Sequence, residues 1–375
     1  MLVTTVIYMP DDEPSSVREF YSIPPNSPVL LNHGGYGRVA TPVHLAQLAH
    51  QKAVDLAPTK FFQYARPGRI KDVVASLAAF LKADPQDLVI VPNATFALNA
   101  LGYTSSVHNW RTAGTSLDYD GVAAMWDQLS SRGLTHQVAK IDPKDQDLAD
   151  QISALRVHSD LLLVPHVVSS TSTLIDLDRL DARRSRGGAF IAVDGAHGPG
   201  MLDLDLSSPP FSAYVGDAHK WLGAPRGTAF LWASPELQEF IRWPISSVST
   251  AQPDFRAQTS WLGTTDPSVW LSIPDAIDFW NTHLAPVRPH LSQLVASASL
   301  ALSILGYASL PSSSSVLMRT FVAPPDVTAD SLKARLAAHE IDAPVISHAS
   351  LVMLRISFSW YTNDHDIDRL LDALS

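Results

Sequence analysis

The chain has 375 residues, 46% of them apolar and 17% charged, with a net charge of −10 and no cysteine. At roughly 150 residues per domain this length predicts two or three domains, and the composition is too apolar for disorder. The scattered acidic balance argues against a nucleic-acid or anionic-membrane partner, and the lack of cysteine excludes disulfides, thiolate metal sites and a cysteine nucleophile.

The N-terminus begins MLVTTVIYMP and turns acidic at residues 11–13. It has no basic region, and its apolar run is too short for a signal peptide. No stretch of about 18 apolar residues is present to span a membrane. We therefore expect a soluble cytoplasmic protein.

Helical periodicity appears at residues 43–57 and 69–83 and is followed by short apolar strands that lead into turns or helices. These expected strands are 88–92, 161–168, 189–194 and 228–233. Continuous apolar strands that alternate with helices are typical of a parallel sheet covered on both faces. The sequence therefore predicts an α/β fold.

The character of the chain changes after Trp243-Pro244, where a loop rich in Ser, Thr and Gln precedes a long helical tract. A β-α-β-like unit follows toward the C-terminus. We expect an N-terminal segment (1–38) packed on the small domain, a large α/β domain (39–246) and a small C-terminal domain (247–375).

Polar residues follow the expected strands, at the edge where open parallel sheets bind ligands. Asn93, Ala94 and Thr95 stand at a helix start that suits phosphate, although taken alone they are explained more simply as helix caps. Asp194 at the end of a buried strand needs a hydrogen-bond or charge partner. That partner is either a protonated pyridine nitrogen or the backbone of the next turn, which the carboxylate would cap. Lys220, in an apolar neighbourhood, is either an amine that forms a Schiff base or a surface residue in a turn.

Arg355 lies in VMLRISFS, whose alternation places Leu354 and Ile356 on an apolar face and Arg355 on the opposite face. A planar guanidinium can hold a carboxylate there by two parallel hydrogen bonds. A surface ion pair is the alternative interpretation.

Taken together, these features resemble the fold-type-I enzymes that use pyridoxal 5′-phosphate (PLP). More narrowly they resemble the class V aminotransferase superfamily, in the branch around isopenicillin N epimerase that includes cysteine-conjugate C–S lyases. The matching motifs are LLNHGGYG (30–37), NATFALN (93–99), VDGAHGPG (193–200), HKWLGAPRGTAFLW (219–232), WLGTTDPSVWLSIPDAIDF (261–279) and LRISFSWYTNDHDID (354–368). The resemblance implies a large domain with a mostly parallel sheet covered by helices, plus a smaller α+β C-terminal domain.

The resemblance also implies roles for single residues. Lys220 matches the Schiff-base lysine, which anchors the cofactor and moves the substrate α-proton. Asp194 matches the carboxylate that pairs with the pyridine nitrogen, and His197 a histidine near the ring. The other implied cofactor contacts are Ala94, Thr95, Tyr119 (stacked on the ring), Ser169, His219 and Thr264. The implied substrate contacts are His33, Tyr36 and Arg355, with Arg355 as the clamp for the α-carboxylate.

The match also bears on three further positions, the Gly263-Thr264 pair, Asp217 and His166. Gly263 and Thr264 match a pair that reaches the phosphate of the neighbouring subunit's cofactor, which implies a homodimer with shared active sites; no metal is implied. Asp217 departs from the pattern, because the position three before the lysine is commonly Ser or Asn and faces the phosphate. An anion there repels phosphate unless it accepts from a backbone N–H or points away, so we assign Asp217 no role. His166 is interpreted as a support for Ser169.

The reaction type is less determined than the cofactor. Cysteine desulfurases are excluded because they pass a persulfide through a cysteine, and this chain has none. We favour C–S β-lyase action on a cysteine S-conjugate, which needs no second acid/base beyond Lys220. The alternatives are an epimerase, with Tyr36, His33 or Tyr119 as a second proton donor, and an aminotransferase or decarboxylating deaminase. A PLP-fold protein that has lost activity and a plain α/β binding module are both disfavoured by the joint presence of Lys220, Asp194, Thr95 and Arg355.

Overall fold

The computed structural model describes residues 17–24, 27–142, 144–145, 148–180, 188–348 and 351–375. Within these ranges no helix is both long and apolar enough to pass through a bilayer. The first 13 residues, from which we predicted the lack of a signal peptide, lie outside the described part of the chain.

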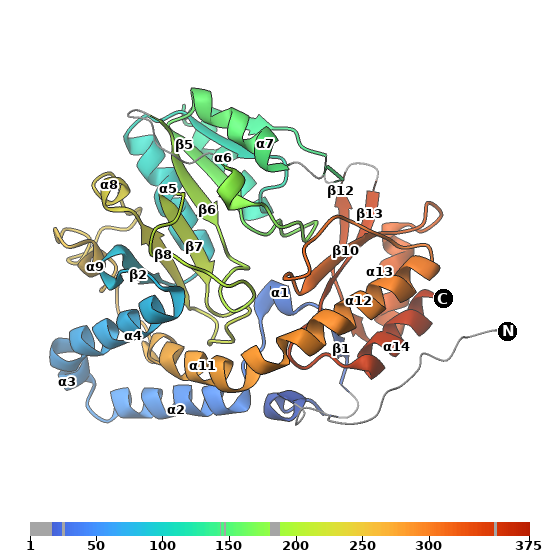
Figure 1. Cartoon of the computed structure of the whole chain (residues 1–375). Coiled ribbons are helices and arrows are strands. Elements are labelled where there is room, and N and C mark those ends of the chain that lie inside the picture. The colour runs from blue at the N-terminus through green and yellow to red at the C-terminus, as the bar shows by residue number, and fades with distance from the viewer. Residues whose placement is uncertain (1–16, 25–26, 143, 146–147, 181–187, 349–350) are drawn as a thin grey trace.

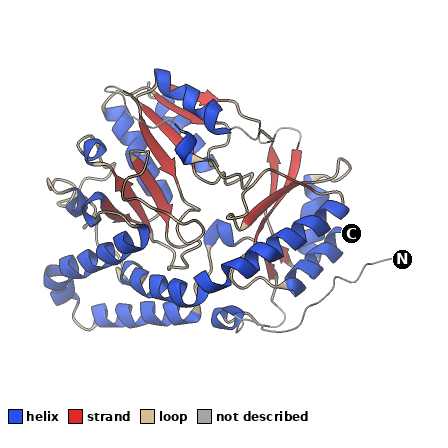
Figure 2. Ribbon diagram, in the orientation of Figure 1, coloured by secondary structure: helices blue, strands red, loops and turns tan. Residues whose placement is uncertain are grey.

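A seven-stranded sheet with the order β2-β8-β7-β6-β5-β3-β4 forms the centre of the large domain (Figure 1, Figure 2). Its strands are β2 (Leu88–Val91), β3 (Thr112–Thr115), β4 (His136–Ala139), β5 (Leu161–Pro165), β6 (Phe190–Asp194), β7 (Ala213–Asp217) and β8 (Ala229–Ala233). Strands β4, β3, β5, β6 and β7 pair in parallel, and β8 runs antiparallel to β7 and β2. The mostly parallel sheet expected from the sequence is confirmed.

Helices cover both faces of this sheet, as Figure 2 shows. Val89 and Val91 of β2 pack in one core with α5 (Ala94–Val107) and α6 (Asp120–Ser130). Leu88 and Ile90, which point the other way because side chains alternate along a strand, pack in a second core with α4. The remaining helices before the small domain are α1 (His33–Tyr36), α2 (Thr41–Asp55), α3 (Pro58–Lys60), α4 (Arg66–Leu81), α7 (Leu148–Ser153), α8 (Pro235–Gln238), α9 (Phe255–Gln258), α10 (Ser268–Leu271) and α11 (Ile273–Phe279).

The small domain is built on an antiparallel sheet of order β12-β13-β10-β9. Its elements are α12 (Arg288–Ile304), β9 (Ala308–Ser309), β10 (Met318–Val322), α13 (Ala329–Ala338), β11 (Ile341–Asp342), β12 (Val345–His348), β13 (Leu351–Ser357) and α14 (Asp364–Leu374). The smaller α+β domain implied by the resemblance is therefore present at the C-terminal end of the chain.

The domain boundary that we expected at residue 247 would separate helices that pack against each other. Helices α10 and α11 contact α2 and α4, which belong to the large domain. Figure 1 shows α11 beside α2 and α4, and α12 continuing toward the small sheet. We therefore propose that the small domain begins near α12 rather than at residue 247.

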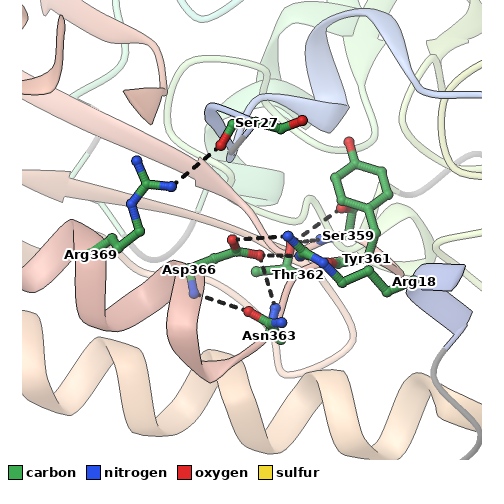
Figure 3. Close-up of polar contacts among 8 residues, drawn as sticks. All are labelled: Arg18, Ser27, Ser359, Tyr361, Thr362, Asn363, Asp366 and Arg369. Carbon is green, nitrogen blue, oxygen red and sulfur yellow. Dashed lines mark hydrogen bonds and ion pairs between the residues drawn. The ribbon is translucent and has the colours of Figure 1, made fainter. Parts of the chain in front are cut away.

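The described part of the N-terminal segment contacts the small domain through a short strand, an ion pair and further hydrogen bonds such as that from Arg369 to the Ser27 carbonyl. Strand β1 (Val29–Leu30) pairs in parallel with β11. Arg18, in a short 3₁₀-helix, donates to Asp366 of α14 at 2.6 Å and to the carbonyl oxygen of Tyr361 (Figure 3). These contacts bring residues from opposite ends of the chain together beside α1.

Candidate active site

A cavity of about 250 Å³ lies at the carboxyl ends of the central strands, where parallel sheets bind ligands. Pro165, Asp194 and Asp217 are the last residues of β5, β6 and β7, and all three line it. Most of the predicted cofactor contacts are in its wall: Ala94, Thr95, Tyr119, Ser169, Asp194, His197, His219 and Lys220. The sheet thus brings together side chains that are far apart in the sequence.

The Asp194 carboxyl group has one hydrogen bond from the described residues, from the Ala196 N–H to Oδ1 at 3.1 Å. Burial raises its pKa, because the charged form loses water, while the Ala196 N–H and the charge of Lys220 act in the opposite direction. No described residue donates to Oδ2. A buried carboxylate oriented into a cavity suits a cationic nitrogen on a ligand.

Lys220 and Asp217 face each other inside the cavity. The Lys220 Nζ lies 3.4 Å from Asp217 Oδ2, and both side chains are nearly buried. Asp217 Oδ1 accepts from the backbone N–H of Ala94, the first residue of α5, at 2.9 Å. We expected an anion at this position to be tolerated if it accepts from a backbone N–H, and the hydrogen bond from Ala94 meets that condition.

The first turn of α5 has three N–H groups that no residue of the helix itself accepts. Asp217 accepts from Ala94, and the side chain of the N-cap residue Asn93 accepts from Phe96 at 2.8 Å. The N–H and hydroxyl of Thr95 have no hydrogen-bond partner in the described part of the chain, and Thr95 lines the cavity. These two donors, together with the positive end of the helix dipole, suit an anion.

Two buried histidines flank the cavity and are held in fixed tautomers. The indole N–H of Trp221 donates to Nδ1 of His197 at 3.3 Å, which leaves the proton on Nε2. His219 donates from Nδ1 to the Thr228 carbonyl at 3.2 Å. Burial lowers the pKa of both side chains, so both are neutral near pH 7.

His33 was expected on the substrate side, but it is buried behind the lysine. Its Nε2 donates to the Lys220 carbonyl at 3.0 Å, and its Nδ1 accepts from the Tyr361 hydroxyl at 3.1 Å. Burial lowers its pKa to about 4. Both ring nitrogens are therefore used in holding the backbone of Lys220.

The turn after α1 also approaches this backbone closely. Gly37 has a φ of +66°, and a Cβ built on it would lie 1.9 Å from the His219 carbonyl oxygen. Glycine is therefore required for α1 to approach the His219-Lys220 segment.

Arg355 reaches the cavity wall through Ser169. Its NH1 donates to the Ser169 carbonyl at 2.8 Å and hydroxyl at 3.0 Å, and its NH2 donates to Asn32 Oδ1 at 3.2 Å. Arg355 is on the face expected from alternation, but that face of β13 is buried as well. Its Nε is buried with no hydrogen-bond partner among the described groups.

The other predicted residues lie outside the cavity wall. Tyr36 is 70% exposed, and Thr264 lies in an exposed bend. His166, interpreted as a support for Ser169, instead bonds through Nδ1 to the Tyr214 hydroxyl at 2.8 Å.

Sequence reasoning gave no role to three residues that fix the site by hydrogen bonds. Asp217 accepts from Ala94. Tyr361 donates to His33, and Trp221 donates to His197. For Asp217 the signal was present, since it belongs to the same turn as the lysine. For Tyr361 and Trp221 no local signal exists, because their partners are distant in the sequence.

The groups that line the cavity fit PLP. Lys220 offers an amine for the aldehyde, Asp194 a carboxylate oxygen for the ring nitrogen, and Thr95 free donors for the phosphate. When bound, PLP supplies an electron sink that weakens the bonds at the substrate α-carbon.

Comparison with known proteins agrees with this assignment. A profile for the family Aminotransferase class-V matches residues 68–370. The isopenicillin N epimerases of Streptomyces clavuligerus and Amycolatopsis lactamdurans are 32% and 28% identical, over 92% and 96% of this chain and 94% and 97% of theirs.

Solved structures of the cystine C–S lyase C-DES share the fold. The complex with its product cysteine persulfide has a TM-score of 0.77 at 18% identity and covers 93% of this chain and 97% of C-DES. A variant with glycine covalently linked to the PLP cofactor has a TM-score of 0.80 at 18% identity, over 98% of this chain and 99% of C-DES.

The fold and the cavity thus define a fold-type-I PLP enzyme. The chain belongs to the aminotransferase class-V family, and its cofactor is pyridoxal 5′-phosphate.

Proposed function

We propose that this enzyme is a C–S β-lyase that converts a cysteine S-conjugate into a thiol, pyruvate and ammonia. The observation that carries the proposal is the set of acid–base groups at the cavity. Of the three side chains considered as a second proton donor, His33 and Tyr36 do not line the cavity, and His33 has both ring nitrogens bonded. A β-elimination needs one acid/base, and Lys220 supplies it.

In this reaction the Cα–H and Cβ–S bonds of the substrate break. Lys220 Nζ takes the proton from Cα, and the sulfur leaves with the electron pair of the Cβ–S bond. The remaining three-carbon fragment takes up water and gives pyruvate and ammonia. Arg355 stands behind Ser169 in the cavity wall, and to hold the substrate carboxylate it exchanges its hydrogen bonds to Ser169 and Asn32 for bonds to the substrate. The neutral His197 and the carboxylate of Asp194 keep the cofactor oriented.

Epimerisation is the second candidate, and two observations favour it. The relatives at 32% and 28% identity are isopenicillin N epimerases. Tyr119 lines the cavity, so a second proton donor is available. The Tyr119→Phe variant separates the two reactions, because loss of the hydroxyl removes a proton donor that epimerisation needs and β-elimination does not.

Product analysis in deuterated water tests the proposal directly. We expect the enzyme with S-substituted cysteines to release pyruvate and a free thiol, detected by NMR. Deuterium at Cα with inverted configuration would instead establish the epimerase. A keto acid that retains sulfur would identify an aminotransferase, and an S-linked aldehyde a decarboxylating deaminase.

The Lys220→Ala variant tests the assignment of the base and anchor. We expect the wild-type protein to be yellow with bound PLP and to gain the mass of the cofactor after borohydride reduction. The variant should gain no mass and lose activity by at least about a thousandfold, because anchor and base are both removed. Lys333→Ala, which removes an exposed lysine on α13, should behave as wild type. Reduction that still attaches the cofactor in Lys220→Ala would contradict the assignment.

We also propose a homodimer in which Thr264 completes the site of the partner subunit. The exposure of Thr264 and its position outside its own cavity support this arrangement. Light scattering should give the mass of a dimer, and Thr264→Ala should weaken PLP binding severalfold. A monomer that binds PLP tightly would refute the proposal.

A further inference from the structure

Asp217 places a carboxylate in the part of the cavity where the cofactor phosphate is expected. It lies at the end of β7 with 4% of its surface exposed, and it accepts one of the three free N–H groups of the first turn of α5. Another is taken by the Asn93 side chain. Only the Thr95 donors in this turn are left for a phosphate among the described groups, and they share the turn with an existing negative charge.

The charged and titratable groups around Asp217 come from two places, the turn after β7 and the end of β6. Lys220 and His219 follow β7, at 3.4 Å and 3.6 Å, and Asp194 ends the neighbouring β6. Asp217 and Asp194 repel each other electrostatically. The ammonium of Lys220 is thus the positive side chain closest to Asp217 among the described residues.

This arrangement becomes unbalanced when the cofactor binds. Above pH of about 6 a phosphate monoester carries two negative charges. When the Lys220 ammonium condenses with the cofactor aldehyde, water leaves and one proton is released, so Asp217 loses its free ammonium neighbour. A carboxylate and a phosphate dianion would then share one helix N-terminus in a buried site, where like charges interact strongly.

We propose that Asp217 makes capture of the cofactor phosphate proton-coupled, so that above neutral pH the PLP-loaded enzyme retains one proton more than it would without this carboxylate. The proton resides on the Asp217 carboxyl group or on a phosphate oxygen, and in either place it removes one of the two competing negative charges. The proposal holds whichever bond of the substrate the enzyme breaks, because it concerns loading of the cofactor alone.

The expected pH dependence has a definite sign. Below pH of about 6 the phosphate already carries a proton and binding requires no uptake. Between pH 7 and 9 the phosphate brings no proton of its own, so the affinity of the wild type for PLP falls, relative to that of Asp217→Asn, as the pH rises. Burial lowers the pKa of both His197 and His219, and both histidines are present in the wild type and in Asp217→Asn alike.

The test is titration of the cofactor-free full-length enzyme with PLP between pH 6 and 9, followed by absorbance. Calorimetry in two buffers of different protonation enthalpy counts the protons taken up. Lys220 condenses with the cofactor in both proteins, so its proton cancels in the comparison, and we expect the wild type to retain about one proton more than Asp217→Asn at pH 8. At this pH the variant should bind PLP about tenfold more tightly or better, because a like charge has been removed.

Two controls isolate the effect on the phosphate. Asp330→Asn makes the same change of charge on the exposed start of α13 and should leave affinity and proton uptake unchanged. Pyridoxal, which lacks the phosphate, should bind the wild type and Asp217→Asn with similar affinity.

Three results would overturn the proposal. The first is the same proton count for the wild type and Asp217→Asn. The second is an Asp217→Asn variant that binds PLP and pyridoxal more weakly to the same extent, since the carboxylate would then serve to hold Lys220 and α5. The third is an equal tightening for both ligands, which would locate the repulsion at the ring and not at the phosphate.

Discussion

The backbone of Lys220 is held from behind by residues that never reach the cavity. His33 donates to the Lys220 carbonyl and accepts from Tyr361, and burial keeps the ring neutral. Gly37 approaches the preceding carbonyl more closely than any side chain would allow. A base that must meet one proton of the substrate gains from such a fixed backbone, because misplacement of a reacting group is costly in rate.

Replacement of His33 by alanine should therefore affect both stability and cofactor attachment. We expect a loss of about 2–4 kcal/mol in the free energy of unfolding, since a buried ring and two hydrogen bonds disappear. The rate at which Lys220 becomes attached to PLP, followed by absorbance, should fall as well. His290→Ala removes an exposed histidine and serves as the control. An unchanged attachment rate in His33→Ala would show that the contact does not position Lys220.

At the scale of elements, α14 anchors the N-terminal segment to the small domain. Asp366 accepts from Arg18, and it also accepts from the Asn363 N–H, while the Asn363 side chain accepts from the Asp366 N–H (Figure 3). The helix therefore has a capping box whose carboxylate also forms the ion pair. Tyr361 lies just before this helix. Its carbonyl oxygen accepts from Arg18 and its hydroxyl group donates to His33, so Tyr361 links the ion pair to α1.

Asp366→Ala and Arg18→Ala should differ in their cost. We expect Asp366→Ala to lower the free energy of unfolding by about 2–4 kcal/mol, because a cap and a nearly buried ion pair are both lost. Arg18→Ala should cost about 1–2 kcal/mol, since Arg18 is partly exposed and water can replace its partner. Denaturant unfolding of both variants and of the double variant measures the coupling. Equal losses in the two single variants would contradict a separate role for the cap.

For the whole molecule, buried titratable groups determine how stability depends on pH. Burial lowers the pKa of His33, His136 and His166 to about 4, and it also lowers the pKa of His197 and His219 from the usual histidine range. The unfolded chain binds protons at these residues near pH 6.5, whereas the folded chain does not, so acidification favours unfolding. Two buried carboxyl groups oppose this trend, because burial raises the pKa of Asp118 to about 7 and also raises that of Asp194.

Five histidines against two carboxyl groups predict a net loss of stability as the pH falls from 6.5 to 4.5. The loss should be on the order of a few kcal/mol. Denaturant midpoints of the PLP-loaded enzyme at several pH values measure it. Stability that rises on acidification would mean that the carboxyl groups dominate.

The sequence by itself determined the α/β fold, the cofactor and most of the cavity wall. Buried strands appear as continuous apolar runs, and Asp194 and Lys220 lie directly at or after such runs, so local pattern and motif order are sufficient. Strand β3, with the sequence TAGT, had no such signal, because its place in the sheet comes from pairing with β4 and β5.

Only the tertiary structure decided how the site is held. Asp217 meets the N–H of Ala94 across 123 positions, and His33 meets Lys220 across 187. Helices α10 and α11 pack on the large domain because their buried faces match α2 and α4. Hydrogen bonds between distant residues leave no periodic trace in a sequence, since they depend on where the chain brings two groups together. For that reason the role of Asp217 required the folded chain.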